Sequence, residues 1–349
     1  MTTAPPAAPT ATLGGWIRRP GYLDTAAYGL PHPAAHAAMS LWLSEWADGA
    51  VPYSHWLEGV DAARALFAGL IGMPESSVAT GVSTSQLAGQ LAQSLRDGAR
   101  VLAPLGEFAS LVYPFLAQRD RGVIVDEVPL SELAHRIDHR SDIVLVSPVS
   151  AATGDVAPLD EIAAAVRGSD TRVIVDGAQA CGWLNVDWSA FDAVIVPAFK
   201  WLCAPRGIAF LSLSRRQLAD QRPSSAGWFS HRDGSRPGLH AADQPDARAL
   251  DISPVWSSWT AAAASLRVLA DVGIDAVNQH SVSLANHFRA GLGRPPADTP
   301  IVVVPDAPRP VVLREAGLTV TSRANHVRIA FHLGNTKDDA DLALEALAR

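Results

Sequence analysis

The sequence predicts an α/β fold in which a large domain with a mostly parallel sheet is followed by a small α+β domain. Two observations lead to this prediction. Short apolar runs alternate with amphipathic helical patterns through the middle of the chain, as in parallel sheets covered by helices on both faces. A length of 349 residues suits one large and one smaller domain. We expect residues 16–254 to form the large domain and 255–349 the small one, with 16–30 packing on the small domain.

Residues 1–15 are rich in Ala, Pro and Thr, and we expect them to form a disordered tail. After this tail, apolar residues at helical spacing predict the first helices, and strands and helices then alternate. The predicted helices are 33–48, 54–71, 83–95, 108–118 and 159–167. The predicted strands are 100–103, 122–128, 142–147, 172–176, 193–197 and 208–213.

The C-terminal part begins with residues 215–250, which are polar, rich in Gly and Pro, and without periodicity. They predict a long loop, and loops of this length are usually functional or mobile. A helical pattern over 257–292 predicts one long helix. Short strands at 301–304 and 327–331, with a final helix from Thr336, complete a small α+β unit.

Composition excludes several classes of protein. The net charge is −7 and no block of like charges occurs, which argues against a nucleic acid or an anionic membrane as partner. No apolar stretch is long enough to cross a bilayer, and the N-terminus has no signal-peptide pattern. Two cysteines, Cys181 and Cys203, offer no disulfide framework. We therefore expect a cytoplasmic protein with no nucleic-acid or membrane partner.

Lys200 is unusual because lysine is nearly absent from this arginine-rich chain. Of 28 basic residues only Lys200 and Lys337 are lysine, yet Lys200 directly follows an apolar run that predicts a buried strand. A buried ammonium is costly unless it is used, and arginine cannot replace a neutral, nucleophilic amine. The main such use is a Schiff base with a carbonyl substrate or with pyridoxal 5′-phosphate (PLP). The alternative is a lysine that extends from a strand end to solvent.

Asp176 ends another predicted strand, and ligands of open α/β sheets lie beyond the carboxyl ends of the strands. An amine and a carboxylate at one edge suit PLP, because a carboxylate keeps the pyridine nitrogen protonated while the lysine holds the aldehyde. Gln179 is a candidate hydrogen-bond donor to the 3-oxygen of the ring. The alternative for Asp176 is a cap at a strand–helix turn.

A phosphate site is expected just before the helix predicted at 83–95. Backbone N–H groups at a helix N-terminus, with the hydroxyls of Ser83 and Thr84, are suited to bind an anion. Ser and Thr also cap helices that bind no ligand, so an ordinary N-cap is the alternative.

The order of these features resembles the class V aminotransferases, a PLP-dependent family of fold type I. Four stretches resemble family motifs: YLDTAA at 22–27, SPVSAATG at 147–154, KWLCAPRG at 200–207 and VRIAFH at 327–332. The third is similar to the variant of the isopenicillin N epimerase and ergothioneine-type C–S lyase branch. The resemblance covers nearly the whole chain.

The resemblance implies roles for further residues. Phe108 would stack on the pyridine ring, and Arg328 would hold the substrate carboxylate. Lys200 would form the internal aldimine and then remove the Cα proton, while Asp176 would stabilise the quinonoid. It also implies a homodimer with active sites at the subunit interface, acting on a small amino-acid substrate.

Departures from the family pattern narrow this interpretation. Desulfurases place a histidine over the ring, whereas Phe108 cannot move protons, and no cysteine follows Cys203. A persulfide-forming desulfurase is therefore not expected. Pro197 and Phe199 stand near positions where the family often has Ser and His for the phosphate. Ser83, Thr84, and Ser253 or Ser257, with a contribution from a partner subunit, are the candidate replacements.

The reaction favoured by these residues is β-elimination of the C–S lyase type, with amino-acid transamination as the alternative. A third hypothesis is a non-catalytic PLP-fold protein that serves as a binding or regulatory subunit. No metal site is expected, because the histidine pairs 32/36 and 135/139 lack the intervening glutamate of zinc proteases.

Overall fold

A seven-stranded sheet forms the centre of the computed structural model, which describes residues 13–49, 51–231, 244–305, 310–323 and 326–348. Its strand order is β1-β7-β6-β5-β4-β2-β3. β7 is antiparallel to both β1 and β6, and all other neighbours are parallel. The strands are β1 (Val78–Gly81), β2 (Arg100–Pro104), β3 (Ile124–Val128), β4 (Ile143–Val146), β5 (Arg172–Asp176), β6 (Ala193–Pro197) and β7 (Ala209–Leu213). The predicted mostly parallel sheet is confirmed.

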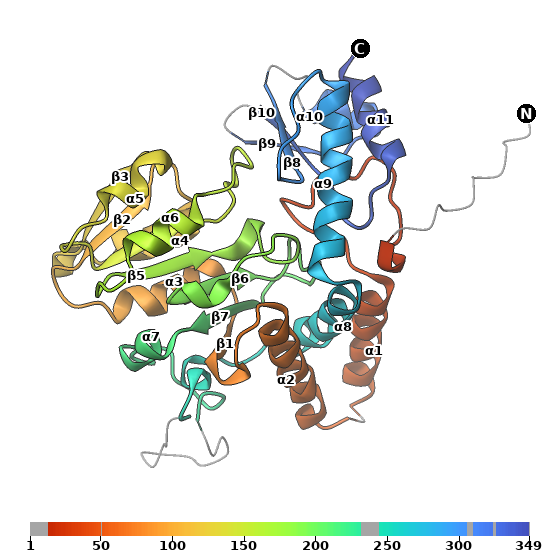
Figure 1. The fold of residues 1–349 in the computed structure, drawn as a ribbon. Coiled ribbons are helices and arrows are strands. Elements are labelled where there is room, and N and C mark those ends of the chain that lie inside the picture. The colour runs from red at the N-terminus through yellow and green to blue at the C-terminus, as the bar shows by residue number, and fades with distance from the viewer. Residues whose placement is uncertain (1–12, 50, 232–243, 306–309, 324–325, 349) are drawn as a thin grey trace, which may run out of the picture.

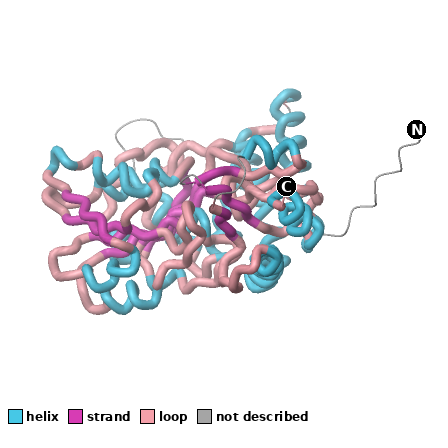
Figure 2. Tube along the Cα trace, turned by 90° about the horizontal axis from the view of Figure 1, so that it is seen from above, coloured by secondary structure: helices cyan, strands magenta, loops and turns pink. Residues whose placement is uncertain are grey.

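Helices cover both faces of this sheet, as the view along it in Figure 2 shows. α3 (Thr84–Gln93) and α4 (Ala109–Leu116) share one apolar core with one face of the strands. The opposite face forms a second core with α2 (Tyr53–Leu70), α6 (Leu159–Ala165) and α8 (Trp256–Val272). Successive residues of a strand point to opposite faces, so Ile174 belongs to the first core and Val173 and Val175 to the second.

A three-stranded antiparallel sheet of order β8-β10-β9 forms a separate third core near the C-terminus. It consists of β8 (Ile301–Val304), β9 (Thr321–Arg323) and β10 (His326–Ala330), accompanied by α9 (Ile274–Gly291), α10 (Pro310–Glu315) and α11 (Lys337–Leu347). Figure 1 shows α8 beside α2 and α1 (Pro33–Asp48), and α9 leading from there to the small sheet. The remaining helices are α5 (Leu133–Arg136) and α7 (Arg215–Ala219).

The N-terminal segment joins the small sheet. Tyr22 and Asp24 form parallel bridges to Thr319 and Ala330, and Leu23 is buried in the third core. This is the kind of contact expected of residues 16–30. The domain boundaries themselves stay a prediction.

Two predicted elements need correction, and other observed elements have no predicted counterpart. The long helix predicted at 257–292 is two helices, because Gly273 (φ 81°, ψ 139°) breaks the helix between α8 and α9. The predicted loop at 215–250 contains α7 and a 3-10 turn, Ala247–Leu250; residues 232–243 lie outside the described part. The elements without a predicted counterpart include β1, β9, α5 and α10.

The described residues bear on only part of two predictions, the disordered N-terminal tail and the absence of a membrane-spanning segment. The predicted disordered tail falls mostly on residues 1–12, which are not described, while Leu13–Gly15 forms a 3-10 turn. Among the described residues, no helix combines the length and apolarity needed to cross a membrane.

Candidate active site

Polar residues follow the carboxyl ends of four neighbouring strands of the large sheet. Asp176 is the last residue of β5, and Lys200 lies three residues beyond the end of β6. Ser147 follows β4, and Glu107 lies three residues beyond β2. The carboxyl ends of parallel strands meet at one edge, where open α/β sheets bind their ligands. The predicted convergence of Lys200 and Asp176 is therefore present in the fold.

Lys200 and Asp176 are both buried, with 8% and 2% of their surface exposed. Burial lowers the pKa of Lys200 to about 8, although the Asp176 carboxylate raises it; Arg328 also lowers it. Burial raises the pKa of Asp176 to about 6, although the Lys200 ammonium and the Ala178 N–H, 2.9 Å from Oδ1, lower it. Because burial outweighs the attraction, both groups shift toward their neutral forms.

Phe108 lies over the amine of Lys200. The Lys200 Nζ atom is 5.4 Å from the centre of the Phe108 ring, and Phe108 is 41% exposed at the start of α4. The preceding residue, Glu107, is held by Ser147, whose N–H and hydroxyl donate to its carboxylate at 2.8 and 2.7 Å. The position of the aromatic ring is thus tied to the adjacent strand end.

Gln179 lies next to Asp176 on a 3-10 turn, and both ends of its amide have protein partners. Its Nε2 donates to Ala26 O at 2.9 Å, and its Oε1 accepts from Trp201 Nε1 at 2.9 Å. One N–H of the amide remains for another acceptor. The contact to a ring oxygen stays a prediction, while the observed bonds connect the Lys200 loop to the N-terminal segment.

Arg328 points from β10 toward the same region and is 1% exposed. Its Nη1 donates to Ala151 O at 2.7 Å, and Nη2 lies 3.9 Å from Asp24 Oδ1. Thr321 joins the two, since its hydroxyl donates to Asp24 at 2.9 Å and accepts from Arg328 at 3.4 Å. Arg328 Nε is buried without a partner in the described residues. Burial lowers the pKa of Arg328 to about 10.

The predicted phosphate residues have ordinary structural contacts. Ser83 caps α3 by accepting the Gln86 N–H at 3.2 Å, as in the alternative interpretation, and Thr84 is buried in the first turn. Ser253 accepts from Trp228 Nε1 at 3.1 Å. Their contact with a phosphate stays a prediction.

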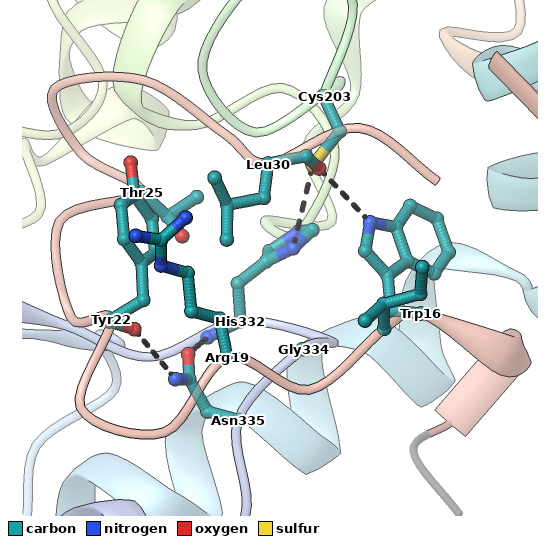
Figure 3. A pocket seen from close by; sticks show the side chains of 10 residues that line it. Trp16, Arg19, Tyr22, Thr25, Leu30, Cys203, His332, Gly334 and Asn335 are labelled. Carbon is teal, nitrogen blue, oxygen red and sulfur yellow. Dashed lines mark hydrogen bonds between the residues drawn. The ribbon is translucent and has the colours of Figure 1, made fainter. Parts of the chain in front are cut away.

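Cys203 belongs to a different place, a small pocket of about 20 Å³ behind the Lys200 loop (Figure 3). Its Sγ lies 3.8 Å from His332 Nδ1, and Trp16 packs against the same histidine ring. Burial raises the pKa of Cys203 to about 12. The pocket is large enough for about one water molecule, and the burial of Cys203 favours the neutral thiol over the nucleophilic thiolate.

Sequence reasoning assigned no role to Asp24 or Glu107. Asp24 pairs with Arg328, and Glu107 connects two strand ends and raises the pKa of Asp176. Both residues lie inside or beside motifs that were recognised, YLDTAA and Phe108. Their position in or next to these motifs is the only local signal of a role for Asp24 and Glu107. Their partners, Arg328 and Ser147, are distant in sequence, so no local pattern predicts the contacts.

The model of the aminotransferase class-V family matches residues 22–310. This match covers most of the chain, so the chain belongs to this family. Isopenicillin N epimerase of Streptomyces clavuligerus is 30% identical over 183 residues, which are 48% of this chain and 44% of that protein. A probable cysteine desulfurase of Methanothermobacter thermautotrophicus is 27% identical over 65% of this chain and 60% of that protein. The matched part of the chain spans about half the length of these relatives.

Solved structures share the fold. The cystine C–S lyase C-DES, in complex with its reaction product cysteine persulfide, matches with a TM-score of 0.85. The identity is 18%, over 95% of this chain and 97% of that chain. The predictions of a class V aminotransferase of fold type I and of PLP as the cofactor are confirmed. The activity of a PLP-dependent lyase or aminotransferase stays a prediction.

The residues of this chain fit PLP. A buried carboxylate beside a buried amine of lowered pKa matches the ring nitrogen and the aldehyde, and an exposed aromatic ring over the amine provides a stacking surface. The unpartnered Nε of Arg328 suits a carboxylate.

Proposed function

We propose that this chain is a PLP-dependent enzyme that acts on an amino acid by β-elimination of the C–S lyase type. The observation that carries the proposal is the buried pair of Lys200 and Asp176 beneath Phe108. The similarity to isopenicillin N epimerase and to a C–S lyase fold is in keeping with it.

PLP, when bound, accepts the electrons that remain at the substrate Cα after a bond to that carbon breaks. Lys200 would hold the cofactor and then, displaced by the substrate amine, take the Cα proton at Nζ. A pKa of about 8 suits this role, because a large part of the amine is neutral near pH 8. Asp176 would hold the proton of the ring nitrogen.

Arg328 would position the substrate. Its guanidinium is the buried cation beside the N-terminal segment, and its Nε has no partner among the described residues. Two parallel hydrogen bonds to the α-carboxylate would fix the orientation of the Cα–H bond. Asp24 and Thr321 would hold the guanidinium in place.

Two features of the chain bear on elimination. Both described cysteines are buried, and the pKa of each is raised to about 12, so transfer of sulfur to a protein thiolate lacks support in the described part. Phe108 covers Lys200 with a ring that exchanges no protons, which leaves Nζ as the group that moves the Cα proton. When the Cβ–S bond breaks, the thiolate would leave and take up a proton. The 2-aminoacrylate that Lys200 would displace from the cofactor then reacts with water, so that a thiol, a keto acid and ammonia are the final products.

We also propose a homodimer and a cytoplasmic location. Support for the dimer comes from a group of large apolar side chains that are more than half exposed on α1 and at the start of α2: Leu41, Leu43, Trp46 and Tyr53. A second copy of this chain would cover them.

The experiment is a screen of amino acids and cysteine conjugates with the purified holoenzyme. We expect a keto acid, ammonia and a thiol from the S-conjugates. Conversion of the bound cofactor to pyridoxamine phosphate, with a keto acid but no released thiol, would instead establish transamination. A protein with no visible cofactor absorbance, and none lost on borohydride treatment, would establish the non-catalytic alternative.

A further inference from the structure

The loop that carries Lys200 closes on itself before it returns to the sheet. The Ala198 N–H donates to Ile208 O at 3.2 Å, and the Ala204 N–H donates to Ala198 O at 3.0 Å. Lys200 and Arg206 therefore belong to one compact loop between the neighbouring strands β6 and β7.

The ring of Phe199 lies within reach of both cations of this loop. Lys200 Nζ is 5.9 Å from the ring centre, and Arg206 Cζ is 4.5 Å from it. The shorter distance indicates a cation–π contact that holds the guanidinium, which is otherwise exposed. No carboxylate within the described ranges forms an ion pair with Arg206, so its charge is uncompensated there.

The sheet register places Arg206 and the start of α3 at the same edge of the sheet, at the ends of the neighbouring strands β7 and β1. Ala209, the first residue of β7, pairs with Gly81, the last residue of β1. Arg206 precedes Ala209 by three residues, and Thr84 follows Gly81 by three, so both chains leave the sheet at the same edge. α3 also contacts both β6 and β7.

The covalent structure of PLP fixes where its phosphate must lie. The aldehyde and the phosphate-bearing methylene are on adjacent ring carbons, while the ring nitrogen is opposite the aldehyde. With the aldehyde at Lys200 and the nitrogen at Asp176, the phosphate lies near the lysine and away from the carboxylate. The Arg206 guanidinium is the second cation of the same loop. α3 begins at the same edge of the sheet, where the N–H groups of its first turn lack carbonyl partners within the helix.

We propose that Arg206 binds the phosphate group of the cofactor, together with the first turn of α3. This inference rests on the proposed role of Lys200. It accounts for the chain's use of Pro197, Ala198 and Phe199 before Lys200, since none of these side chains can donate a hydrogen bond. Ser83 accepts the Gln86 N–H as the cap of α3, and a neutral hydroxyl cannot offer the charge-assisted bonds that the arginine supplies.

The test compares the affinities of the apoprotein for PLP and for pyridoxal, which lacks only the phosphate. Binding is followed by quenching of tryptophan fluorescence in the wild type, Arg206→Ala, Arg206→Gln and the control Arg323→Ala. Arg323 is exposed and, like Arg206, lowers the pKa of Lys200, but lies on β9. We expect Arg206→Ala and Arg206→Gln to weaken PLP binding by about tenfold to a hundredfold. Pyridoxal binding by these variants, and both affinities of Arg323→Ala, should change less than about twofold.

Each other result overturns the inference. Equal losses for PLP and pyridoxal would mean that Arg206 acts by positioning Phe199, and no loss for either would mean that another group holds the phosphate. Equal weakening in Arg323→Ala would mean a general effect of charge. If the wild type attached neither compound at Lys200, the proposed function would fail first. Circular dichroism of Arg206→Gln, which keeps a side chain of similar length, guards against misfolding.

Discussion

Two buried cation–carboxylate pairs of this molecule differ in how fully their charges are satisfied. Arg64 and Asp251, each 1% exposed, form a two-pronged pair with distances of 2.7 and 3.2 Å. Thr80 adds two hydrogen bonds to the carboxylate, from its N–H at 2.7 Å and its hydroxyl at 3.0 Å. The same guanidinium donates to Val78 O, which connects α2, β1 and the segment before α8.

Lys200 and Asp176 are also buried but have far fewer hydrogen-bond partners. Asp176 accepts the Ala178 N–H, and the described structure gives the Lys200 amine aromatic contacts rather than acceptors. Burial favours the neutral forms of both groups, and it also raises the pKa of Asp251, so the two pairs differ in their hydrogen bonds rather than in the effect of burial. We infer that the Arg64–Asp251 pair, with many hydrogen bonds, stabilises the fold. The Lys200–Asp176 pair, with few, is available to a ligand.

Lys200→Ala should have the largest effect, because no other lysine lies in the site. We expect no covalent cofactor after borohydride reduction and no turnover, while PLP still binds reversibly. Peptide mapping of the reduced wild type should find the label on Lys200. A label on Lys337, which begins α11, would contradict the assignment.

Arg64→Ala should reduce the free energy of unfolding by roughly 3–5 kcal/mol, because it leaves the buried Asp251 charge uncompensated. Urea denaturation of the apoprotein measures this. The matched variant is Lys200→Ala, whose apoprotein should lose much less stability. A desolvated ammonium is removed, and Asp176, whose pKa is already raised to about 6, can take up a proton. Equal losses in the two variants would remove the distinction between the pairs.

Arg328→Lys tests a third buried pair, Arg328 and Asp24, whose charges lie 3.9 Å apart. This pair has fewer hydrogen bonds than Arg64–Asp251 and more than Lys200–Asp176. Lysine keeps the charge but cannot make two parallel bonds, so kcat/KM for amino acids should fall by the equivalent of roughly 2–5 kcal/mol. PLP binding and the reaction with amines that lack a carboxylate should be nearly unchanged. Normal turnover of amino acids would move the carboxylate anchor elsewhere, with Arg206 or Arg323 as the next candidates.

Asp176→Asn should keep the fold and lower turnover by about a hundredfold, the order seen when one preorganised electrostatic group is lost. The amide cannot offset the charge of a protonated ring nitrogen. Steady-state rates and the thermal midpoint of the same preparations measure both statements. Near-normal rates would reduce Asp176 to a cap on the turn after β5.

The pH dependence of cofactor incorporation should show the smallest effect. PLP reacts with a neutral amine, and Lys200 has a pKa lowered from 10.5 to about 8. The rate of incorporation should therefore rise with pH about tenfold per unit and level off above about pH 8. Stopped-flow absorbance measures the profile. Asp176→Asn should move the midpoint to lower pH, because the carboxylate raises the pKa of Lys200; a rise that continues to pH 10 would contradict burial as the dominant influence.

The sequence predicted those parts of the fold whose signals are local. Apolar runs such as 193–197 marked the central strands, and the strand-end positions of Asp176 and Lys200 followed from them. The break at Gly273 is not predictable from the sequence, because the amphipathic pattern continues on both sides of it and a lone glycine is tolerated inside helices. β1, with the sequence Val-Ala-Thr-Gly, lacks the run of large apolar residues that marks β4 and β8, which have the same length.

Contacts between distant residues were not predictable from local patterns. Both ends of the Gln179 amide bind Ala26 and Trp201, which leaves one N–H for the predicted contact with the ring. The Arg64–Asp251 pair joins residues 187 positions apart, and neither residue stands in a recognisable motif. Such pairs follow from the topology, which the strand order reveals and the spacing of residues does not.

The N-terminal segment also has a consequence for the order of events during synthesis. The Gly29 N–H donates to Phe199 O at 2.8 Å, so this segment lines the loop of Lys200. The same segment binds near the other end of the chain, through Leu23 N–H to Thr319 O at 3.0 Å and Gly21 N–H to Asp339 Oδ1 at 2.9 Å. A ribosome releases residue 21 long before residue 339. The N-terminal segment, residues 21–29, can therefore be held in place beside the Lys200 loop only after translation of the chain is nearly complete.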